Sequence, residues 1–208
     1  MKAYFPWYNG YCNPYSEYFD KWFIEDFGKN RLWQKTLISR RKKFIKKAVL
    51  QESYLADAQH HYFRGEFEQS LQSLDEMNLK KSRWRRRKVL LTGLSYYRIL
   101  NKINQKDFAD FEDSLALYRK MKGKNVPERS AKLLAIYRVV SGQSTDYFER
   151  IAPKYKLYQI EAKYYDGLSY LNQNQPEEAK ACFQEIVNEN PELFYVKEAK
   201  KYLEELAW

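Results

Sequence analysis

The chain has 208 residues and a formal net charge of +10, from 37 Lys and Arg side chains against 27 Asp and Glu side chains. Seven glycines and six prolines are too few for the many turns of a β-sandwich, whereas abundant Lys, Glu, Leu, Gln and Ala favour helices. The composition therefore predicts an all-α fold.

The two cysteines, Cys12 and Cys182, lie far apart with no His or Cys at metal-ligand spacing, which excludes a disulfide framework and a zinc site. No stretch reaches the ~18 apolar residues needed to span a bilayer, and the N-terminus lacks the apolar core of a secretory signal. We expect a cytoplasmic protein, with peripheral attachment to a membrane as an open alternative.

Residues 1–50 form the most aromatic part of the chain, with residues 16–27 and 30–52 as predicted helices. We predict an N-terminal helical extension over residues 1–50 and a helical repeat domain over residues 51–208. Within the extension, residues 29–50 contain no acid and nine basic side chains: Lys29, Arg31, Lys35, Arg40, Arg41, Lys42, Lys43, Lys46 and Lys47. Such a segment suits an anionic membrane surface or a nucleic acid, or it caps the first repeat and leaves its lysines in water.

From residue 51 onward, the pattern predicts four helical hairpins, each with a small residue in its first helix. These residues, Ala58, Gly93, Ala135 and Gly167, recur 35, 42 and 32 positions apart. The predicted hairpin turns lie at residues 64–66, 141–144 and 172–176, and the second hairpin carries an insertion over residues 101–110. Pro127 and Pro191 are expected to end the second helices of the second and fourth hairpins. Residues 193–206 are amphipathic and predict a C-terminal capping helix.

The sequence Gly-Leu-Ser-Tyr occurs twice, at residues 93–96 and 167–170. In the last hairpin, Gly167, Tyr170, Ala179, Phe183 and Pro191 follow the small, aromatic, small, aromatic, proline order of tetratricopeptide repeats. This hairpin resembles that family closely, although Lys163 and Asp166 stand where large apolar residues are usual. The resemblance implies a right-handed α-solenoid of about four hairpins with a capping helix.

In tetratricopeptide proteins the first helices of the hairpins line a concave groove that holds a partner segment. The resemblance implies a partner-binding set on these helices: Tyr62, Arg87, Tyr97, Arg98, Arg129, Lys132, Tyr164 and Asn172. Basic and tyrosine side chains suit a peptide with carboxylates and apolar anchors. Ile136 stands where the family's dicarboxylate clamp needs an asparagine, which argues against that subclass.

A second basic run begins at residue 80 and surrounds Trp84, an arrangement that suits phosphates or acidic peptides. The alternative is a set of solvated or ion-paired side chains beside a tryptophan that packs inward. Together the two runs give a predicted basic patch: Arg40, Arg41, Lys42, Lys43, Lys46, Lys47, Arg83, Arg85, Arg86, Arg87 and Lys88.

No constellation of residues indicates an enzyme. His60 and His61 are adjacent, so on a helix they point about 100° apart and do not converge on one metal. We therefore predict no catalytic residue, metal, cofactor or small-molecule substrate. The leading prediction is a protein-protein interaction scaffold for an acidic protein or peptide, and the alternatives are a nucleic-acid-binding protein and an adaptor on an anionic membrane.

Overall fold

The computed structural model describes residues 47–81 and 84–206. Its regular structure in these residues consists of nine α-helices and one 3₁₀ helix, with no strand. In chain order they are α3 (Lys47–Arg64), α4 (Phe67–Asp75), η2 (Leu79–Lys81), α5 (Trp84–Asn104), α6 (Phe111–Arg119), α7 (Val126–Val140), α8 (Tyr147–Arg150), α9 (Lys156–Asn172), α10 (Pro176–Ile186) and α11 (Phe194–Glu205). The predicted all-α class is confirmed for this part of the chain.

Helices α3, α5, α7 and α9 all end in the same type of turn. The turn residues Gly65, Lys106, Gly142 and Asn174 have positive φ angles of 79°, 59°, 89° and 58°. In each turn, the N–H of the residue with positive φ donates to the carbonyl oxygen of the residue three positions before it. The N–H of the following residue donates to the carbonyl oxygen five positions before it, as Glu66 does to His61. This is the Schellman pattern, which satisfies the last carbonyl groups of a helix. The four turns repeat one local structure along the chain.

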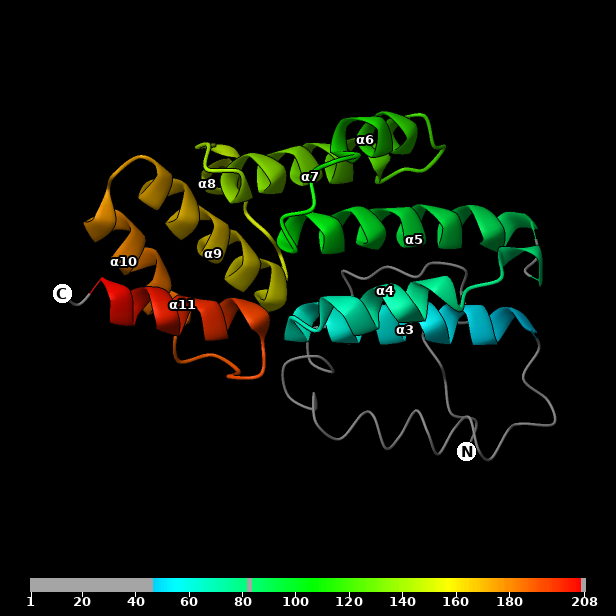
Figure 1. Ribbon diagram of the computed structural model, residues 1–208, viewed down its shortest axis with the longest axis horizontal. Coiled ribbons are helices and arrows are strands. Elements are labelled where there is room, and N and C mark those ends of the chain that lie inside the picture. Colours follow the sequence, from blue (N-terminus) through cyan, green and yellow to red (C-terminus); the bar gives the residue numbers. More distant parts are fainter. Residues whose placement is uncertain (1–46, 82–83, 207–208) are drawn as a thin grey trace.

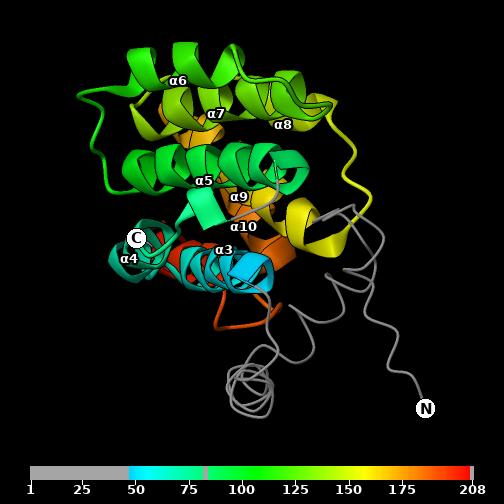
Figure 2. The ribbon, with the colours of Figure 1, turned by 90° about the vertical axis from the view of Figure 1, so that its right-hand side faces the viewer.

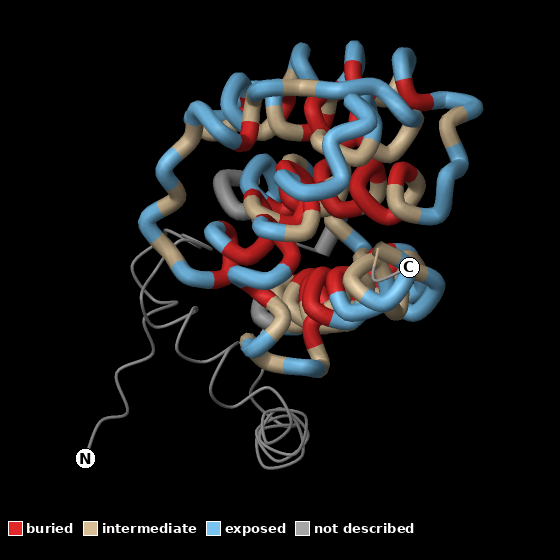
Figure 3. Tube along the Cα trace, turned by 90° about the vertical axis from the view of Figure 1, so that its left-hand side faces the viewer, coloured by how far each residue is buried: buried red, intermediate tan, exposed pale blue. Residues whose placement is uncertain are grey.

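Helices that follow one another in the chain pack together. α4 lies against α3 and α5, α6 against α5 and α7, α8 against α7 and α9, and α10 against α9 and α11. The first helices of the four hairpins also contact one another in order, and α3, α5 and α7 form successive layers (Figures 1 and 2). The buried positions face the centre of this stack (Figure 3).

The last helix returns to the first hairpin, and α9 lies between α11 and the upper layers (Figure 1). Arg64 Nη1 and Glu192 Oε2 form an ion pair of 2.8 Å, and the rings of Phe67 and Phe194 meet edge to face with centroids 5.1 Å apart. At Gly65, an added β-carbon would lie 2.9 Å from Cδ2 of Phe194. α11 therefore joins the two ends of the described helical stack, beyond the role of a terminal cap.

Several predicted boundaries are corrected. Pro127 stands in the first turn of α7, where a missing N–H is harmless, and α6 has already ended at Arg119. Similarly, α10 ends at Ile186, ahead of Pro191. α5 continues through residues 101–104, so only residues 105–110 of the predicted insertion form a loop. The predicted division into two domains at residues 50 and 51 stays a prediction: this position falls within α3, and residues 1–46 lie outside the described part.

The two Gly-Leu-Ser-Tyr segments occupy different environments. A β-carbon added at Gly167 would lie 2.7 Å from Cζ of Phe183, within the same hairpin, whereas one added at Gly93 would lie 2.8 Å from Cδ2 of Leu55, in the preceding hairpin. Both glycines permit close helix packing, but against different partners.

Candidate functional site

A hydrogen-bonded polar cluster occupies the interior where the first helices and α11 meet. Tyr195 Oη donates to Glu161 Oε1 at 2.9 Å and lies 3.4 Å from Tyr62 Oη. Asn104 Nδ2 donates to Tyr62 Oη at 3.2 Å, and Tyr165 Oη donates to Asn104 Oδ1 at 3.1 Å. Glu161 also forms an ion pair with Lys132 of α7. We call these six residues the central polar cluster: Tyr62, Asn104, Lys132, Glu161, Tyr165 and Tyr195.

The two charged side chains of the central polar cluster, Lys132 and Glu161, neutralise each other, and its tyrosines are uncharged. Burial raises the pKa of the Tyr62, Tyr165 and Tyr195 hydroxyls well above their usual range, and the Glu161 carboxylate raises them further. These tyrosines remain protonated donors at neutral pH. Lys132 Nζ supplies the counter-charge and lies 4.8 Å from the centre of the Tyr158 ring. Because each charge is paired and the tyrosines are fully buried, the cluster holds the fold together and offers no surface to a ligand.

The eight predicted partner-binding residues are all engaged within the chain. Tyr62, Tyr97 and Tyr164 are at most 4% exposed, and Lys132 belongs to the central polar cluster. Arg98 pairs with Asp75 on α4, and the Arg129 guanidinium lies 4.8 Å from the centre of the Tyr96 ring. Asn172 donates to the carbonyl oxygens of Val139 and Gln143, both at 2.8 Å. Arg87 donates to the carbonyl oxygens of Leu79 and Lys80.

Partner binding in the groove stays a prediction, and the three buried tyrosines offer it little exposed surface. The inner faces of α3, α5, α7 and α9 are filled by one another and by α11, because buried side chains on these helices and on α11 form one continuous core. In the described residues, a shallow depression lies between α5 and α6. It is lined in part by Ile99, Lys102, Asp107 and Phe111 and has space for about one water molecule.

The rings of the adjacent histidines, His60 and His61, lie edge to face with their centroids 5.8 Å apart. Nδ1 of His61 lies 2.6 Å from Oε2 of Glu66. Among the residues described, no group of three or more His, Cys, Asp or Glu side chains is arranged to hold a metal ion. None of the helices in the same residues is long and apolar enough to cross a bilayer.

The predicted basic patch is described only in part. Arg40, Arg41, Lys42, Lys43, Lys46 and Arg83 lie outside the described residues, and the backbones of Lys47, Arg85 and Arg86 are helical. Arg87 and Lys88, in the first turns of α5, are exposed.

The structure adds four basic residues that the sequence analysis did not single out. Arg119, the last residue of α6, and Lys120, Lys122 and Lys124 of the α6–α7 loop are all exposed. None of them pairs with an acidic side chain within the described residues, although acids pair with many other cations, such as Arg98, Lys102 and Lys163. The sequence signal is the absence of any Asp or Glu between residues 114 and 127.

The fold brings this loop beside α5. A β-carbon added at Gly123 would lie 3.6 Å from Cγ2 of Thr92. Lys88 precedes Thr92 by one helical turn, about 6 Å, and occupies the same side of α5. Two segments that are separate in the sequence therefore lie side by side, and we call their cations the basic surface: Lys88, Arg119, Lys120, Lys122 and Lys124.

Charge is divided unevenly along the chain. Residues 80–140 contain 17 basic and 5 acidic side chains, a net charge of +12, whereas residues 141–206 contain 8 basic and 12 acidic side chains, a net charge of −4. The basic surface lies in the positive segment, so the positive field is concentrated on the second and third hairpins.

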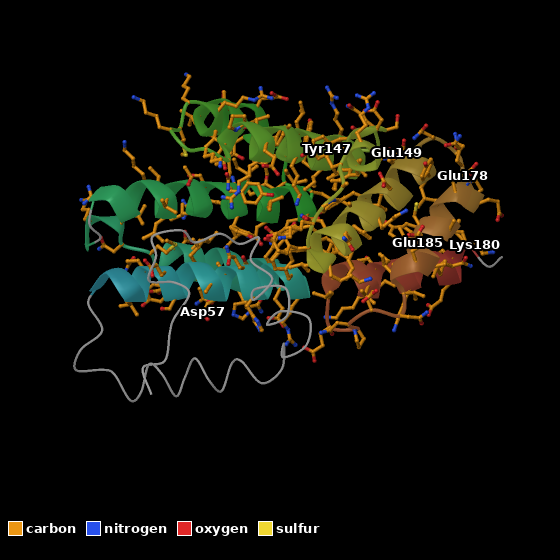
Figure 4. The ribbon with its side chains drawn as sticks, turned by 180° about the vertical axis from the view of Figure 1, so that it is seen from behind. Asp57, Tyr147, Glu149, Glu178, Lys180 and Glu185 are labelled. Atoms are coloured by element: carbon orange, nitrogen blue, oxygen red, sulfur yellow. The ribbon has the colours of Figure 1, made fainter. Side chains whose placement is uncertain are left out.

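A buried acid distinguishes the fourth hairpin. Asp166 on α9 is 6% exposed, and its Oδ1 has no hydrogen-bond partner. The pKa of this carboxyl is raised to about 7, chiefly by burial and then by the neighbouring Glu149, with Lys163 opposing the shift and Glu185 adding to it. Figure 4 labels Glu149 on α8 and Glu185 on α10, on either side of α9. At this position, which departs from the tetratricopeptide pattern, the fold holds an acid that can be protonated near neutral pH.

Comparison with known proteins identified no relative: no family model, no curated protein and no solved structure matches this chain.

Proposed function

We propose that this chain is a non-enzymatic interaction module, built from about four degenerate tetratricopeptide-like repeats, that binds an anionic partner through the basic surface. The observation that carries the proposal is the group of four exposed cations, Arg119, Lys120, Lys122 and Lys124, for which the described residues provide no acid. Such an uncompensated field attracts anions and raises their rate of association.

The repeat assignment is supported by the four matching turns after α3, α5, α7 and α9. It is further supported by second helices that pack between consecutive first helices. Consecutive hairpins stack on one another, as in solenoid repeats, and the first hairpin also contacts α11.

We favour the basic surface over the inner groove as the binding site, because the side chains at the predicted groove positions already have partners within the chain. A peptide would have to displace the tyrosines of α3 and α9 from the core, or break the Lys132–Glu161 ion pair. Both changes would leave buried polar groups unpaired, which is unfavourable. The basic surface needs no such rearrangement.

The test compares two variants of the full chain with equal changes in charge. In the loop variant, glutamine replaces the four cations: Arg119→Gln, Lys120→Gln, Lys122→Gln and Lys124→Gln. In the control variant, glutamine replaces four scattered cations: Lys106→Gln, Arg138→Gln, Lys180→Gln and Lys200→Gln. Binding to heparin and to polyglutamate is measured at about 50 mM salt, where the screening length is still well over 10 Å.

We expect the loop variant to lose most of its binding to at least one polyanion, while the control variant stays close to the wild type. Circular dichroism and thermal unfolding should be the same for all three proteins, because the substituted side chains are largely exposed. Equal binding by the loop and control variants would contradict the proposal that the basic surface is the contact site.

A further inference from the structure

We infer that the anionic partner is a nucleic acid, held through its phosphate backbone at the basic surface. This inference rests on the proposed function and names the partner of the same site. It is carried by two observations together: the density of cations in the α6–α7 loop and the small volume of the depression between α5 and α6 in the described part of the chain.

The cations in the loop are closely spaced. Lys120, Lys122 and Lys124 occupy every second position. Since two residues of extended chain span at most about 7 Å, the α-carbons of successive lysines lie within that distance. Arg119 adds a fourth positive charge at the end of α6. DNA presents one negative charge per roughly 1.7 Å of its axis, so several phosphates can lie within reach of such a row.

The surface continues onto α5 at Lys88, and the neighbouring Arg87 is a further exposed cation on the same helix. The Arg87 guanidinium is held by two carbonyl oxygens, those of Leu79 and Lys80. These acceptors are uncharged, so they fix the side chain without neutralising it. The loop lies above α5 (Figure 1), so a polyanion strand can contact cations on both elements.

An acidic peptide is less well matched to this surface. Peptide recognition gains most of its affinity from a few side chains buried in pockets. In the described part of the chain, the depression between α5 and α6 is too small for an anchor side chain, and its lining includes Asp107 and Asp110 as well as Lys102. Phosphate contacts require no pocket, because released counterions supply most of the affinity of sequence-independent binding.

The experiment measures binding of the full-length wild type, the loop variant and the control variant to fluorescent oligonucleotides. The probes are a 20-base single strand and a 20-base-pair duplex of mixed sequence, titrated by fluorescence anisotropy from about 50 to 200 mM salt. Polyglutamate of similar length and vesicles containing anionic lipid serve as the competing partner classes.

We expect the wild type to bind an oligonucleotide more tightly than polyglutamate or anionic vesicles at about 50 mM salt. For the loop variant, the affinity should fall about tenfold or more, and the slope of log K against log salt should become shallower by about 3, since each lost phosphate contact removes about 0.7 to 0.9. For the control variant, the slope of log K against log salt should differ from the wild-type slope by no more than one phosphate contact contributes, about 0.7 to 0.9.

Four results would overturn the inference. No oligonucleotide binding by the wild type at about 50 mM salt would exclude a nucleic acid. Tighter binding to polyglutamate would identify an acidic protein segment, and tighter binding to vesicles would identify a membrane; either result leaves the proposed anion-binding function intact if the loop variant loses that binding. Oligonucleotide binding with equal salt slopes in both variants would place the contact elsewhere on the chain.

Discussion

The hydroxyl of Tyr195 donates a 2.9 Å hydrogen bond to the carboxylate of Glu161, which joins α11 to α9 inside the core. The same carboxylate forms an ion pair with Lys132 of α7. One buried acid thus links the C-terminal helix to the third and fourth hairpins, and Tyr62, at 3.4 Å from Tyr195, extends the link to the first hairpin.

Replacing Lys132 by Glu should unfold the protein, because two carboxylates would then share a buried site. Even Lys132→Met, which keeps the volume but removes the charge, should cost about 3–5 kcal/mol in the free energy of unfolding, since Glu161 loses its counter-charge. Urea unfolding followed by circular dichroism measures this loss.

Arg98→Glu serves as the control, because Arg98 and Asp75 are 43% and 70% exposed in their ion pair. Its effect should stay below about 1 kcal/mol. The double variant Lys132→Met with Glu161→Leu should recover much of the stability lost by Lys132→Met alone. Similar losses from Arg98→Glu and Lys132→Met would contradict the role assigned to the buried pair.

Gly167→Ala should destabilise the fourth hairpin by about 1–3 kcal/mol through overpacking. The new methyl group would lie 2.7 and 2.9 Å from Cζ and Cδ1 of Phe183, and that ring is stacked on Tyr202 with centroids 5.2 Å apart, so it cannot move aside. Thermal unfolding provides the measurement.

Gly93→Ala is the matched change in the other Gly-Leu-Ser-Tyr segment. Its methyl group would meet Leu55 Cδ2 at 2.8 Å, the end of a side chain that can rotate, and alanine favours a helix over glycine by up to about 1 kcal/mol. These two effects oppose each other, so we expect the free energy of unfolding of Gly93→Ala to stay close to that of the wild type. Phe183→Leu should partly restore the Gly167→Ala protein, and a failure of both comparisons would rule out the packing explanation.

Asp166 should make the free energy of unfolding depend on pH. The folded carboxyl has a pKa of about 7 against an ordinary value of 3.8, so between these values the folded state holds a proton that the unfolded state has released. Stability should therefore fall as pH rises from about 4 to about 7 and then level off, with a total loss of at most about 4 kcal/mol.

Asp166→Asn keeps the shape of the side chain and removes its titration. Urea unfolding at pH 4, 5.5 and 7.5 should show the variant gaining on the wild type as pH rises. The titratable groups that face Asp166 are the same in the wild type and the variant: Glu149, Lys163, Tyr170, Cys182 and Glu185. The control is Asp113→Asn, on the exposed face of α6. Parallel pH profiles for wild type and Asp166→Asn would refute the assignment.

Removal of residues 193–208 should abolish cooperative unfolding. The truncation deletes Leu193, Tyr195, Val196 and Ala199, all fully buried, and each large buried side chain contributes about 1.5–3 kcal/mol. Their sum approaches the whole stability of a typical domain. The truncated protein should bind more of a hydrophobic dye and should lose its sharp thermal transition. Lys200→Gln, on the same helix, should change neither property.

A good part of the helical order could be predicted from local sequence. Gly65 and Gly142 mark turns because glycine adopts positive φ without strain, and the structure has turns at both. The equivalent turn at Lys106 was not predictable, because lysine carries no such preference and only the surrounding packing selects it. This is why residues 101–104 were assigned to an insertion although they continue α5.

The candidate site was predicted less well. Sequence reasoning identified Arg87 and Lys88 as basic residues of interest, but not the cations of the α6–α7 loop, which Met121 and Gly123 interrupt. Their proximity to α5 depends on the contact between Gly123 and Thr92, a tertiary contact with no local signal. The tyrosines were assigned to an open groove because the return of α11 to α3 is equally invisible in the sequence.

The contact between α11 and α3 also limits how this protein can change in size. An open solenoid can gain or lose a hairpin and keep all remaining interfaces, because each unit touches only its neighbours. Here an inserted hairpin would separate Glu192 from Arg64 and Phe194 from Phe67. A joint between the two ends of the described stack therefore opposes the gain or loss of a hairpin, whereas a loop such as the one between α6 and α7 can change in length without breaking that joint.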